Sequence, residues 1–506
     1  MKKPTEFYLK TVSPIHIGCD EIYEPMAFAV DEQSKQMVIF DQFIFISQLG
    51  EEDKRKFMDI CSRGTISSIL EIYHFLSNRP VSGKRVDVCY GFLDHYKDTL
   101  NIPLKDEKKI KQELNQFQIP RTAFRSIDQR PYVPGSAIKG ALRTAYLNMM
   151  EKRKKLSAKG KERNARVLEQ KLMNYDGIPS DPFRLVKVSD FMPVGEVKTK
   201  IIYGINKKKA PSVHETRGVP LIFETIQPGS IFKGTITVTA PLSGAGIKET
   251  VDDVETLLKS ALLFYSNEKE REEKELKNIG LDLHEQSKEL REQENTFLLR
   301  IGRHSGAESV TIKGHRDIYI MGKRGERGTF KDHATTTWLT SETKNPAIMS
   351  NLSPFGWAYL NSVTDNFVDE FRIREQKWQD KREKDTKEAQ VEVERQIKLA
   401  EEAAKEEKKK AAMEEKRRKE EERKKAEFEA MSPEERDLLV LAESDPGEQL
   451  VFDIFARIDQ FSPENQKKAA LVIKTYWEKN GRWNKKDCSK KQWVKVQSLK
   501  KIIGEN

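Results

Sequence analysis

The sequence predicts an α+β protein that continues into a long charged helix and a small α-helical module. Three observations lead to this prediction. Strand-like runs of β-branched and aromatic residues alternate with helical apolar patterns as far as about residue 365. Apolar residues then become sparse as far as about residue 430, and Glu is repeatedly followed four positions later by Lys or Arg. Beyond that point, apolar residues and helix start signals return.

The composition sets limits on partners and compartment. The chain has 506 residues, enough for two to four domains, and a net charge of +10, which favours an anionic partner. No run of 18 apolar residues and no signal peptide is recognisable, so we expect no membrane insertion and a cytoplasmic location. No cofactor is expected, and the scattered cysteines predict reduced thiols without a metal site; they are Cys19, Cys61, Cys89 and Cys488.

The first 120 residues read as short strands and helices. A strand is expected over 6–17, and the turn Asp31–Lys35 joins two further strands at 26–30 and 36–40. Asp41 is a candidate helix cap. Further elements are a helix over 52–77, a strand near 86–92 and a charged helix near 105–117.

The most distinctive stretch is residues 130–147, where a Pro-Gly turn leads into a helix. Ser136 is the expected cap of this helix, and Lys139 and Arg143 lie four residues apart on one face. Free amide groups and cations at a helix start can receive a phosphate. Gly140 would allow another backbone to approach closely. A capped helix with a merely solvated basic face explains the same residues, and this alternative stays open.

A strongly basic segment should continue this helix until Asn174–Pro182. Its charges suit either a solvated face or an anionic partner. The loop Gly204–Arg217, which carries Lys207, Lys208 and Lys209, is predicted to form a basic hairpin tip that contacts phosphates. Strands are expected on both sides of this loop, at 184–190, 197–204, 219–226 and 231–239.

A glycine-rich loop follows a mostly helical stretch at 248–296. A buried strand enters the loop Gly302–Gly306, which contains Arg303 and His304 and can present backbone amides to a phosphate or ribose. The loop is not a P-loop, because no Lys-Ser or Lys-Thr follows the second glycine. A second basic, glycine-rich stretch occupies 322–328.

The last 140 residues are predicted to be helical. Repeated Glu-to-Lys pairs without a sustained heptad favour a long single helix at 366–430 over a coiled coil. Ser432 and Ser462, each followed by proline, begin helices of a small module. Near the end, Trp483 and Trp493 stand among lysines, which suits either nucleic-acid contact or core tryptophans below a solvated face.

Four motifs in this order resemble the RAMP proteins of CRISPR systems, and among them the fifth-subunit family of type III-A Csm effectors. The resemblance covers roughly residues 5–360, and its most specific part is the Pro-Gly-Ser-x-x-Lys-Gly-x-x-Arg element. The motifs are Ser13-Pro-Ile-His-Ile-Gly, Val133-Pro-Gly-Ser-Ala-Ile-Lys-Gly-Ala-Leu-Arg, Asp181-Pro-Phe-Arg-Leu-Val-Lys-Val-Ser-Asp and Leu299-Arg-Ile-Gly-Arg-His-Ser-Gly.

The resemblance implies a RAMP-type fold of tandem ferredoxin-like (RRM-like) units with a protruding β-hairpin. It implies a non-catalytic RNA-binding subunit that caps the 3′ end of the crRNA filament and supports crRNA maturation in antiviral defence. The implied partners are crRNA, the other Csm subunits and, as further candidates, host ribonucleases. The expected division is an N-terminal unit with a helical insertion (1–240), a second unit (241–365), the charged helix (366–430) and the basic module (431–506).

For this chain, the resemblance implies that two elements contact the backbone of the guide RNA. The hairpin lysines Lys207 and Lys208 are weaker candidates for the same contact. Nothing beyond about residue 365 matches the family pattern, so the partner of that region is open. The implied RNA-binding residues are Gly135, Ser136, Lys139, Gly140 and Arg143 in the first element and Gly302, Arg303 and Gly306 in the second.

Two other functions remain open. In a guide-processing endoribonuclease, His16 and His304 would act as acid and base with help from Lys139, although neither histidine has an orienting partner in the sequence. The loop residues Asp20 and Asp31 lie where related backbone subunits carry a cleaving aspartate, but aspartates are also common turn residues. A scaffold would instead recruit protein partners through residues 366–506.

Overall fold

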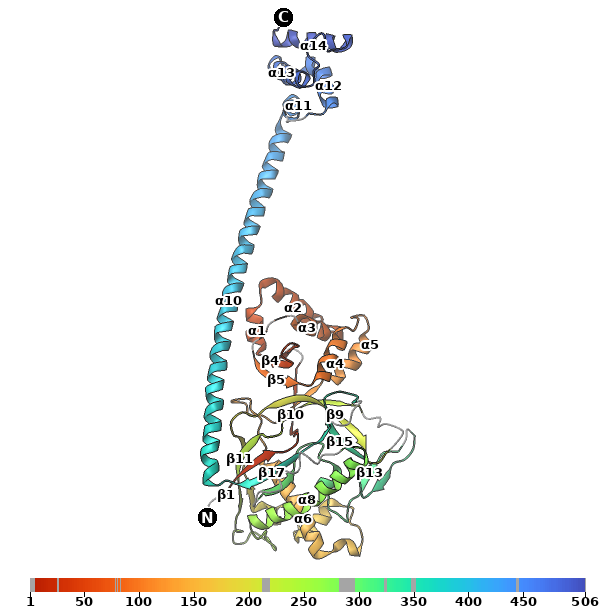
Figure 1. Cartoon of the computed structure of the whole chain (residues 1–506), viewed down its shortest axis with the longest axis vertical. Helices are drawn as coiled ribbons and strands as arrows, with labels where there is room; N and C mark the ends of the chain where they lie inside the picture. Colours follow the sequence, from red (N-terminus) through yellow and green to blue (C-terminus); the bar gives the residue numbers. More distant parts are fainter. Residues whose placement is uncertain are drawn as a thin grey trace. The chain divides into compact units, whose positions relative to one another are not determined.

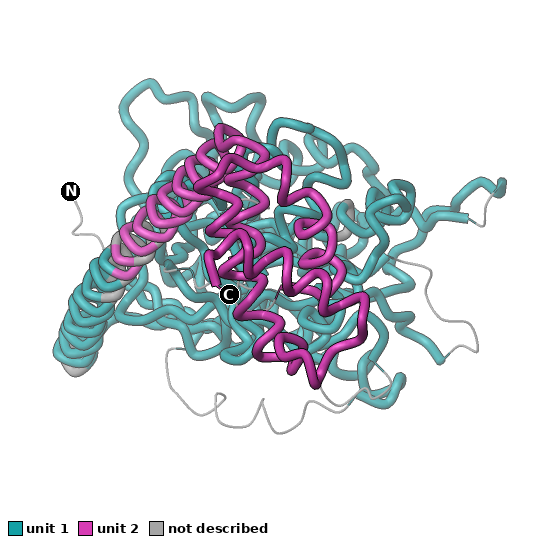
Figure 2. Tube along the Cα trace, turned by 90° about the horizontal axis from the view of Figure 1, so that it is seen from above, with its two compact units in different colours: residues 1–398 teal, residues 399–506 magenta. Residues whose placement is uncertain are grey.

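The computed structural model describes residues 5–505 except 25–26, 78, 80, 82, 212–218, 282–295, 323–324, 347–351 and 443–445 (Figure 1). The chain divides into two compact units, residues 1–398 and residues 399–506 (Figure 2). Each unit has a hydrophobic core of its own.

The first sheet of unit 1, called sheet A, is built around β1 (Thr5–Thr11). Its neighbours β11 and β17 both run antiparallel to it. Both faces of β1 are covered, which is why Phe7, Tyr8 and Leu9 are all buried instead of alternating. The other strands of sheet A are β11 (Ile231–Val238), β17 (Trp357–Ser362), the edge strands β12 (Thr296–Arg300) and β7 (Val186–Val188), and β8 (Met192–Pro193).

Two helices cover one face of sheet A, α6 (Gly135–Lys154) and α8 (Val254–Asn278) (Figure 1). Their apolar residues recur at three- and four-residue spacing and form one face of each helix. This core contains the side chains of Ile138, Leu142 and Ala145 from α6, Leu258, Ala261 and Tyr265 from α8, and Phe7, Leu9, Leu299, Trp357 and Leu360 from the strands.

The second sheet, sheet B, is organised by β9 (Thr199–Lys208). The first half of β9 pairs with β10 and, in parallel, with β5, and its second half pairs with β15. The strands are β16 (Ser353–Pro354), β15 (Thr336–Ser341), β5 (Lys84–Val88), β4 (Gln36–Ile39), β3 (Phe28–Asp31) and β10 (Leu221–Ile226).

Helices from the first 120 residues pack against sheet B, and two short strand pairs lie outside the sheets. Tyr73, Phe92, Tyr96 and Phe117 form the aromatic part of the core at this sheet. The helices are α1 (Gln42–Gln48), α2 (Glu51–Arg63), α3 (Ile66–Ser77), α4 (Tyr90–Leu100) and α5 (Glu107–Gln116). The strand pairs are β2 (Gly18–Tyr23) with β6 (Ile119–Thr122) and β13 (Ile318–Ile320) with β14 (Thr329–Lys331).

Several predicted boundaries need correction. The helix expected over 52–77 is two helices, because Gly64 adopts a left-handed conformation (φ 57°) and ends α2. The first helix was predicted to continue through the basic segment to Asn174–Pro182, but α6 ends at Lys154, and a separate helix, α7 (Ala165–Met173), ends at Asn174. The predicted Asp41 cap is confirmed, since its carboxylate accepts the Phe43 and Ile44 N–H groups.

The predicted hairpin tip is also in the wrong place. Strand β9 continues to Lys208, so Lys207 and Lys208 lie opposite Thr337 and Thr336 of β15. Residues 212–218, at the end of the predicted loop, are outside the described residues. The early start of the predicted loop at Gly204 was wrong because β15, about 130 residues later, supplies a strand partner that local sequence does not reveal.

Strands from the predicted segments 1–240 and 241–365 pair with one another in both sheets, as β1 does with β17 and β9 with β15. The mixed α/β architecture of unit 1 agrees with the predicted fold class. The division into tandem ferredoxin-like units and the four domain boundaries stay predictions.

The long helix α10 (Asp365–Ala430) begins within unit 1. Its residues Phe367 and Phe371 pack against the Tyr8 ring, with centroids 4.7 and 5.5 Å away, and so cover the second face of β1. Arg130 forms a bidentate ion pair with Glu375 at 2.8 and 2.9 Å. Its guanidinium also lies 3.5 Å from the centre of the Trp378 ring. The root of α10 is therefore fixed to unit 1 by apolar and charged contacts.

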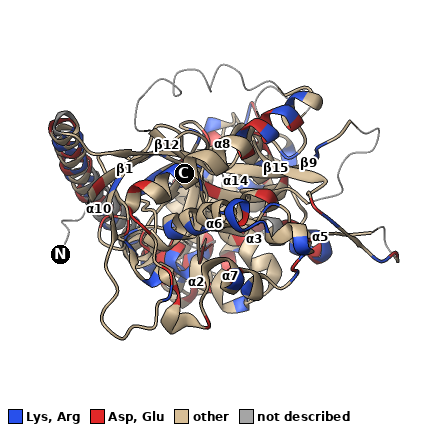
Figure 3. Ribbon diagram, turned by 90° about the horizontal axis from the view of Figure 1, so that it is seen from below, with Lys and Arg blue, Asp and Glu red and all other residues tan. Residues whose placement is uncertain are grey.

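Further along α10, basic and acidic residues alternate around the helix (Figure 3). In unit 2, Lys419 pairs with Glu415 at 2.8 Å and Lys424 with Glu420 at 3.6 Å. Such pairs contribute about 0.2–0.5 kcal/mol each, which supports the predicted solvated single helix. No helix among the described residues is long and apolar enough to cross a lipid bilayer.

Unit 2 ends in a four-helix module with its own core. Ser432 and Glu435 form the predicted capping box, in which the Ser432 Oγ accepts the Glu435 N–H and the Glu435 carboxylate accepts the Ser432 N–H. The helices are α11 (Pro433–Leu441), α12 (Glu448–Arg457), α13 (Pro463–Lys479) and α14 (Lys490–Ile503). Their core contains Leu441, Val451, Ile454, Ile473, Trp477, Trp483, Val496 and Leu499.

Candidate nucleic-acid interface

The N-terminal end of α6 is built differently from the prediction. The helix begins at Gly135, with Pro134 at the cap position, and Ser136 is an exposed residue of the first turn that does not cap it. The Asp190 carboxylate accepts the Gly135 N–H at 2.8 Å. The protein therefore supplies its own anion for the first amide of this helix, which reduces the capacity of the helix end to hold a phosphate.

Gly135 is required by close packing. A Cβ atom at this position would lie 2.5 Å from the Val188 carbonyl oxygen and 2.6 Å from that of Ser189. The end of β7 is thereby held directly against the start of α6. Gly140, in contrast, faces open space, and a Cβ atom at that position would meet nothing within 4 Å. An incoming backbone has room at Gly140 but not at Gly135.

Lys139 is the cation in the first two turns of α6 for which the described residues supply no ion pair. It is half-buried and forms no ion pair with any residue in the described parts of the chain. Burial lowers the pKa of its ammonium group, and the nearby Lys187 cation lowers it further. Lys187 is exposed on β7 and likewise has no acidic partner among the described residues. The Asp181 carboxylate opposes this lowering of the Lys139 pKa but forms its ion pair with Arg143, so a further anion near Lys139 and Lys187 would be favoured.

Arg143 lies on the same helix but is held by the protein. Its guanidinium contacts the Glu169 carboxylate at 2.5 Å and the Asp181 carboxylate at 2.9 Å. It also donates to the Tyr175 hydroxyl at 3.3 Å. These contacts join α6, α7 and the chain before β7, so Arg143 stabilises the packing of these segments. Its predicted contact with RNA stays a prediction.

The glycine-rich loop wraps against the Ser13–Gly18 segment. The Arg303 N–H donates to the His16 carbonyl at 2.8 Å, and a Cβ atom at Gly302 would lie 2.6 Å from that same oxygen. Both Gly302 (φ 86°) and Gly306 (φ 80°) need the left-handed region that glycine tolerates. The Arg303 side chain is exposed, and its nearest carboxylate is that of Asp20 at 3.4 Å.

The fold anchors the two predicted RNA-binding elements in one core. Ile138 of α6, Ile301 before the glycine-rich loop and Ile15 all belong to the core of sheet A. Lys207 and Lys208 are instead in sheet B. Lys187 was missed as a candidate, although its signal was present in the third RAMP motif, where a lysine stands between two buried or half-buried valines.

The two histidines of the nuclease alternative share one aromatic cluster. The Phe223 ring lies 4.9 Å from the His16 ring and 5.1 Å from the His304 ring. His16 is buried and its Nδ1 donates to the Glu224 carbonyl at 2.7 Å. Burial lowers the pKa of His16, and burial together with the charges of His16 and Arg303 lowers that of His304 to about 4. Neither ring is arranged to be the protonated acid at neutral pH.

The two loop aspartates have different surroundings. Asp31 accepts the Gln33 and Ser34 N–H groups and so closes the β3–β4 turn, as a turn aspartate does. Asp20 is exposed and has a positive φ of 61° at an irregularity of the β2–β6 pair. The described residues contain no cluster of three or more His, Cys, Asp or Glu side chains that would hold a metal ion.

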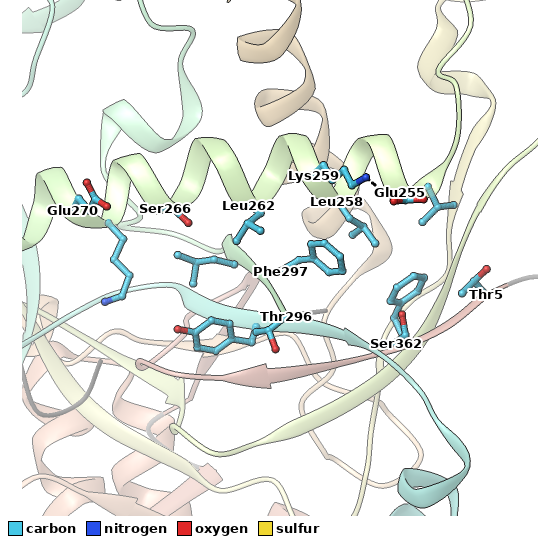
Figure 4. A pocket seen from close by; sticks show the side chains of 15 residues that line it. Thr5, Glu255, Leu258, Lys259, Leu262, Ser266, Glu270, Thr296, Phe297 and Ser362 are labelled. Carbon is cyan, nitrogen blue, oxygen red and sulfur yellow. Dashed lines mark ion pairs between the residues drawn. The ribbon is translucent and has the colours of Figure 1, made fainter. Parts of the chain in front are cut away.

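A groove of about 820 Å³ lies away from these residues, between α8 and the strands β1, β12 and β17 (Figure 4). Its floor and wall are apolar, formed by side chains such as Phe7, Phe297, Leu258 and Leu262. Its rim carries Lys259, which is paired with Glu255 at 2.6 Å. None of the predicted RNA-binding residues lines this groove.

Comparison with known proteins identifies the family to which this chain belongs. The family model described as the RAMP superfamily matches residues 8–305, more than half of the chain. The chain belongs to the RAMP superfamily. The matched region of this RAMP protein contains α6, β7 and the glycine-rich loop as far as Ser305. The predicted resemblance to RAMP proteins is confirmed.

A curated relative, the CRISPR system Cms protein Csm5 of Methanocaldococcus jannaschii, is 28% identical over 209 residues. The match covers 38% of this chain and 44% of the relative, so it spans less than half of either protein.

Two solved structures are also similar. One comes from a cryo-EM structure of a Csm–crRNA–target RNA ternary complex of a type III-A CRISPR-Cas system, with 18% identity, a TM-score of 0.46 and coverage of 71% of this chain and 100% of the other. The second is the crystal structure of T. onnurineus Csm5, with 16% identity, a TM-score of 0.40 and coverage of 69% and 99%.

Proposed function

We propose that this RAMP protein is a non-catalytic RNA-binding subunit of a type III-A CRISPR (Csm) effector complex. In this proposal it caps the 3′ end of the crRNA filament and supports crRNA maturation in antiviral defence. Its partners are crRNA and the other Csm subunits. Membership in the RAMP superfamily and the partial sequence match to a Csm5 protein support this assignment. A host ribonuclease as partner rests only on the resemblance.

The observation that carries RNA binding is the pair Lys139 and Lys187 at the start of α6. Neither cation forms an ion pair with a described residue, although Arg143 nearby forms two. An RNA phosphate supplies the missing negative charge, and the open space at Gly140 leaves room for the sugar-phosphate backbone. Exposed Ser136 offers a hydroxyl on the same turn. The contact is to the backbone and does not read sequence.

The state of the two histidines supports the non-catalytic part of the proposal. Metal-independent RNA cleavage by two histidines needs one ring protonated and one neutral. The lowered pKa values of His16 and His304 keep both rings neutral near pH 7. The His16 Nδ1 is also occupied by the Glu224 carbonyl.

The test replaces both lysines, Lys139→Gln with Lys187→Gln, in the full-length chain and measures binding of single-stranded RNA by fluorescence anisotropy at several salt concentrations. Loss of two phosphate contacts should reduce the slope of log K against log salt by about 1.4. Lys108→Gln with Lys111→Gln on α5 is the matched control, because both of these lysines are exposed and the net charge changes equally. An unchanged slope in the Lys139 and Lys187 variant would overturn the proposed site.

The capping role needs a separate measurement in the assembled complex. Photo-crosslinkable 4-thiouridine is placed either at the 3′ end or at the 5′ end of the guide, and crosslinked peptides are mapped by mass spectrometry. We expect crosslinks to residues 130–147 or 299–308 only from the 3′ label. Crosslinks from the 5′ label alone would contradict capping, and RNA cleavage that disappears in His304→Ala would identify a nuclease instead.

A further inference from the structure

The end of the chain carries a charge asymmetry that the proposed function does not use. Residues 480–506 contain eight Lys and Arg but only two Asp and Glu. The preceding part of the same module, residues 431–479, contains six basic and ten acidic residues. Positive charge is therefore concentrated in α14 and the loop before it, whereas the rest of the module carries more acidic than basic residues.

Packing fixes which face of α14 is exposed. Val496 and Leu499 are fully buried in the module core. The opposite face presents Lys490, Val494 and Lys501 at spacings of four and seven residues, and Val494 is 61% exposed. The helix thus turns its apolar face inward and leaves Lys490 and Lys501, with Val494 between them, on the outside.

Six lysines of α14 and of the loop before it, five of them exposed and Lys500 half-buried, are together named the α14 lysine surface. The two carboxylates of the same segment do not neutralise it, because Glu505 pairs with Lys474 of α13 at 2.5 Å and only Asp487 remains nearby in sequence. None of the six forms an ion pair with a described residue, whereas Arg482 pairs with Glu448. The six are Lys485, Lys486, Lys490, Lys491, Lys500 and Lys501.

The burial of the nearby tryptophans indicates which part of a nucleic acid this surface could contact. Trp477 and Trp483 are 1% and 8% exposed and belong to the module core, and Trp493 is half-buried against the same core. The interpretation of these residues as core tryptophans below a basic face agrees with the structure. No aromatic platform for base stacking is present among these three side chains, so a bound nucleic acid would be held through its phosphates.

We propose that the α14 lysine surface is a second RNA-binding site, which takes the sugar-phosphate backbone of RNA without regard to sequence. Lysines are point charges suited to a row of phosphates, whereas protein interfaces are poor in lysine and rich in aromatic residues and arginine. Ser489 caps α14, which adds the positive end of the helix beside Lys490 and Lys491. This inference rests on the proposed function in taking RNA as the polyanion, but it uses none of the α6 residues.

The test compares two full-length variants with equal charge change. The first carries Lys485→Gln, Lys486→Gln, Lys490→Gln and Lys491→Gln, and all four side chains are exposed, so the module should keep its fold. The second, the control, carries Lys→Gln at four exposed positions of α10, namely 416, 419, 424 and 425. Binding of a 30-nucleotide uridine oligomer is measured by anisotropy against salt, and circular dichroism checks that both variants are folded.

We expect the first variant to bind RNA at least tenfold more weakly at 0.1 M salt and to lose about 3 from the slope of log K against log salt, since four contacts at about 0.7 each are removed. The α10 control should change neither quantity. RNA affinity and slope equal to wild type in the first variant would overturn the inference, and a loss confined to binding of polyglutamate would show that the surface docks an acidic protein instead.

The α6 and α14 sites fail or succeed separately. If the Lys139 and Lys187 variant loses RNA affinity while the α14 variant does not, the proposed function stands and this inference is wrong. The reverse result would support the α14 lysine surface and refute the α6 site. Peptide mapping of ultraviolet crosslinks gives the same distinction directly, between residues 130–147 and residues 480–506.

Discussion

Glu308 gives a quantitative test of how the glycine-rich loop is held in place. It lies in the short 3-10 helix Ala307–Val310, directly after that loop, and only 1% of its side chain is exposed. Its carboxylate contacts the Lys209 ammonium at 2.5 Å and accepts the Ala334 N–H at 2.8 Å. Arg271 of α8 lies 3.9 Å away. One buried carboxylate thus connects the loop to both helix α8 and the end of β9.

The pKa of Glu308 sets the magnitude of its contribution. Burial alone would raise this pKa, but the charges of Lys209 and Arg271 and the hydrogen bonds outweigh burial and hold it at about 2, against an ordinary value of 4.5. At about 1.4 kcal/mol for each pH unit, the ionised Glu308 contributes about 3 kcal/mol to folding at pH 7. Because the pKa is lowered in the folded state, this contribution is complete above pH 4.5 and is lost as the pH falls toward 2.

Glu308→Gln should therefore lower the free energy of unfolding of unit 1 by about 3 kcal/mol at pH 7, since it also leaves Lys209 with one carboxylate partner fewer. The difference from wild type should shrink to about half at pH 3. Hydrogen–deuterium exchange in increasing urea, followed in peptides that cover β12 and residues 307–310, reports on this unit. Glu270→Gln is the control, because Glu270 is an exposed residue of α8. A destabilisation below 1 kcal/mol, or one that is independent of pH between 7 and 3, would contradict this account.

Two further predictions concern the same region. Gly302→Ala should destabilise the protein by about 1–3 kcal/mol, because it combines a positive φ with a Cβ atom 2.6 Å from the His16 carbonyl oxygen. Gly140→Ala, in open space within α6, should instead stabilise the protein by up to about 1 kcal/mol. Thermal melting of both variants checks these opposite signs. His304 should stay neutral at pH 5.5 in the folded protein, with its ring signals in NMR titrating near 4. Since its pKa is below the unfolded value of 6.5, stability should fall as the pH drops from 6.5 toward 4, and His304→Gln should weaken this dependence. A His304 titration near 6.5 would contradict the buried stacking on Phe223.

Sequence alone determined those features that depend on neighbours within a few residues. The Asp41 cap, the Ser432 capping box, a helix end at Asn174 and the charged helix α10 were predicted because caps and i,i+4 pairs are local interactions. The order of the RAMP motifs gave the family, since it depends only on residue identity and sequence spacing.

The tertiary structure alone decided which candidate residues have partners in the protein. Asp190, 55 residues away, occupies the Gly135 amide, and Glu169 and Asp181 hold Arg143. The Lys187 charge acts on Lys139 because β7 packs against the start of α6. The physical reason is that the free energy of binding an anion depends on which charges are already neutralised, and neutralisation is set by contacts between distant residues that no local pattern records.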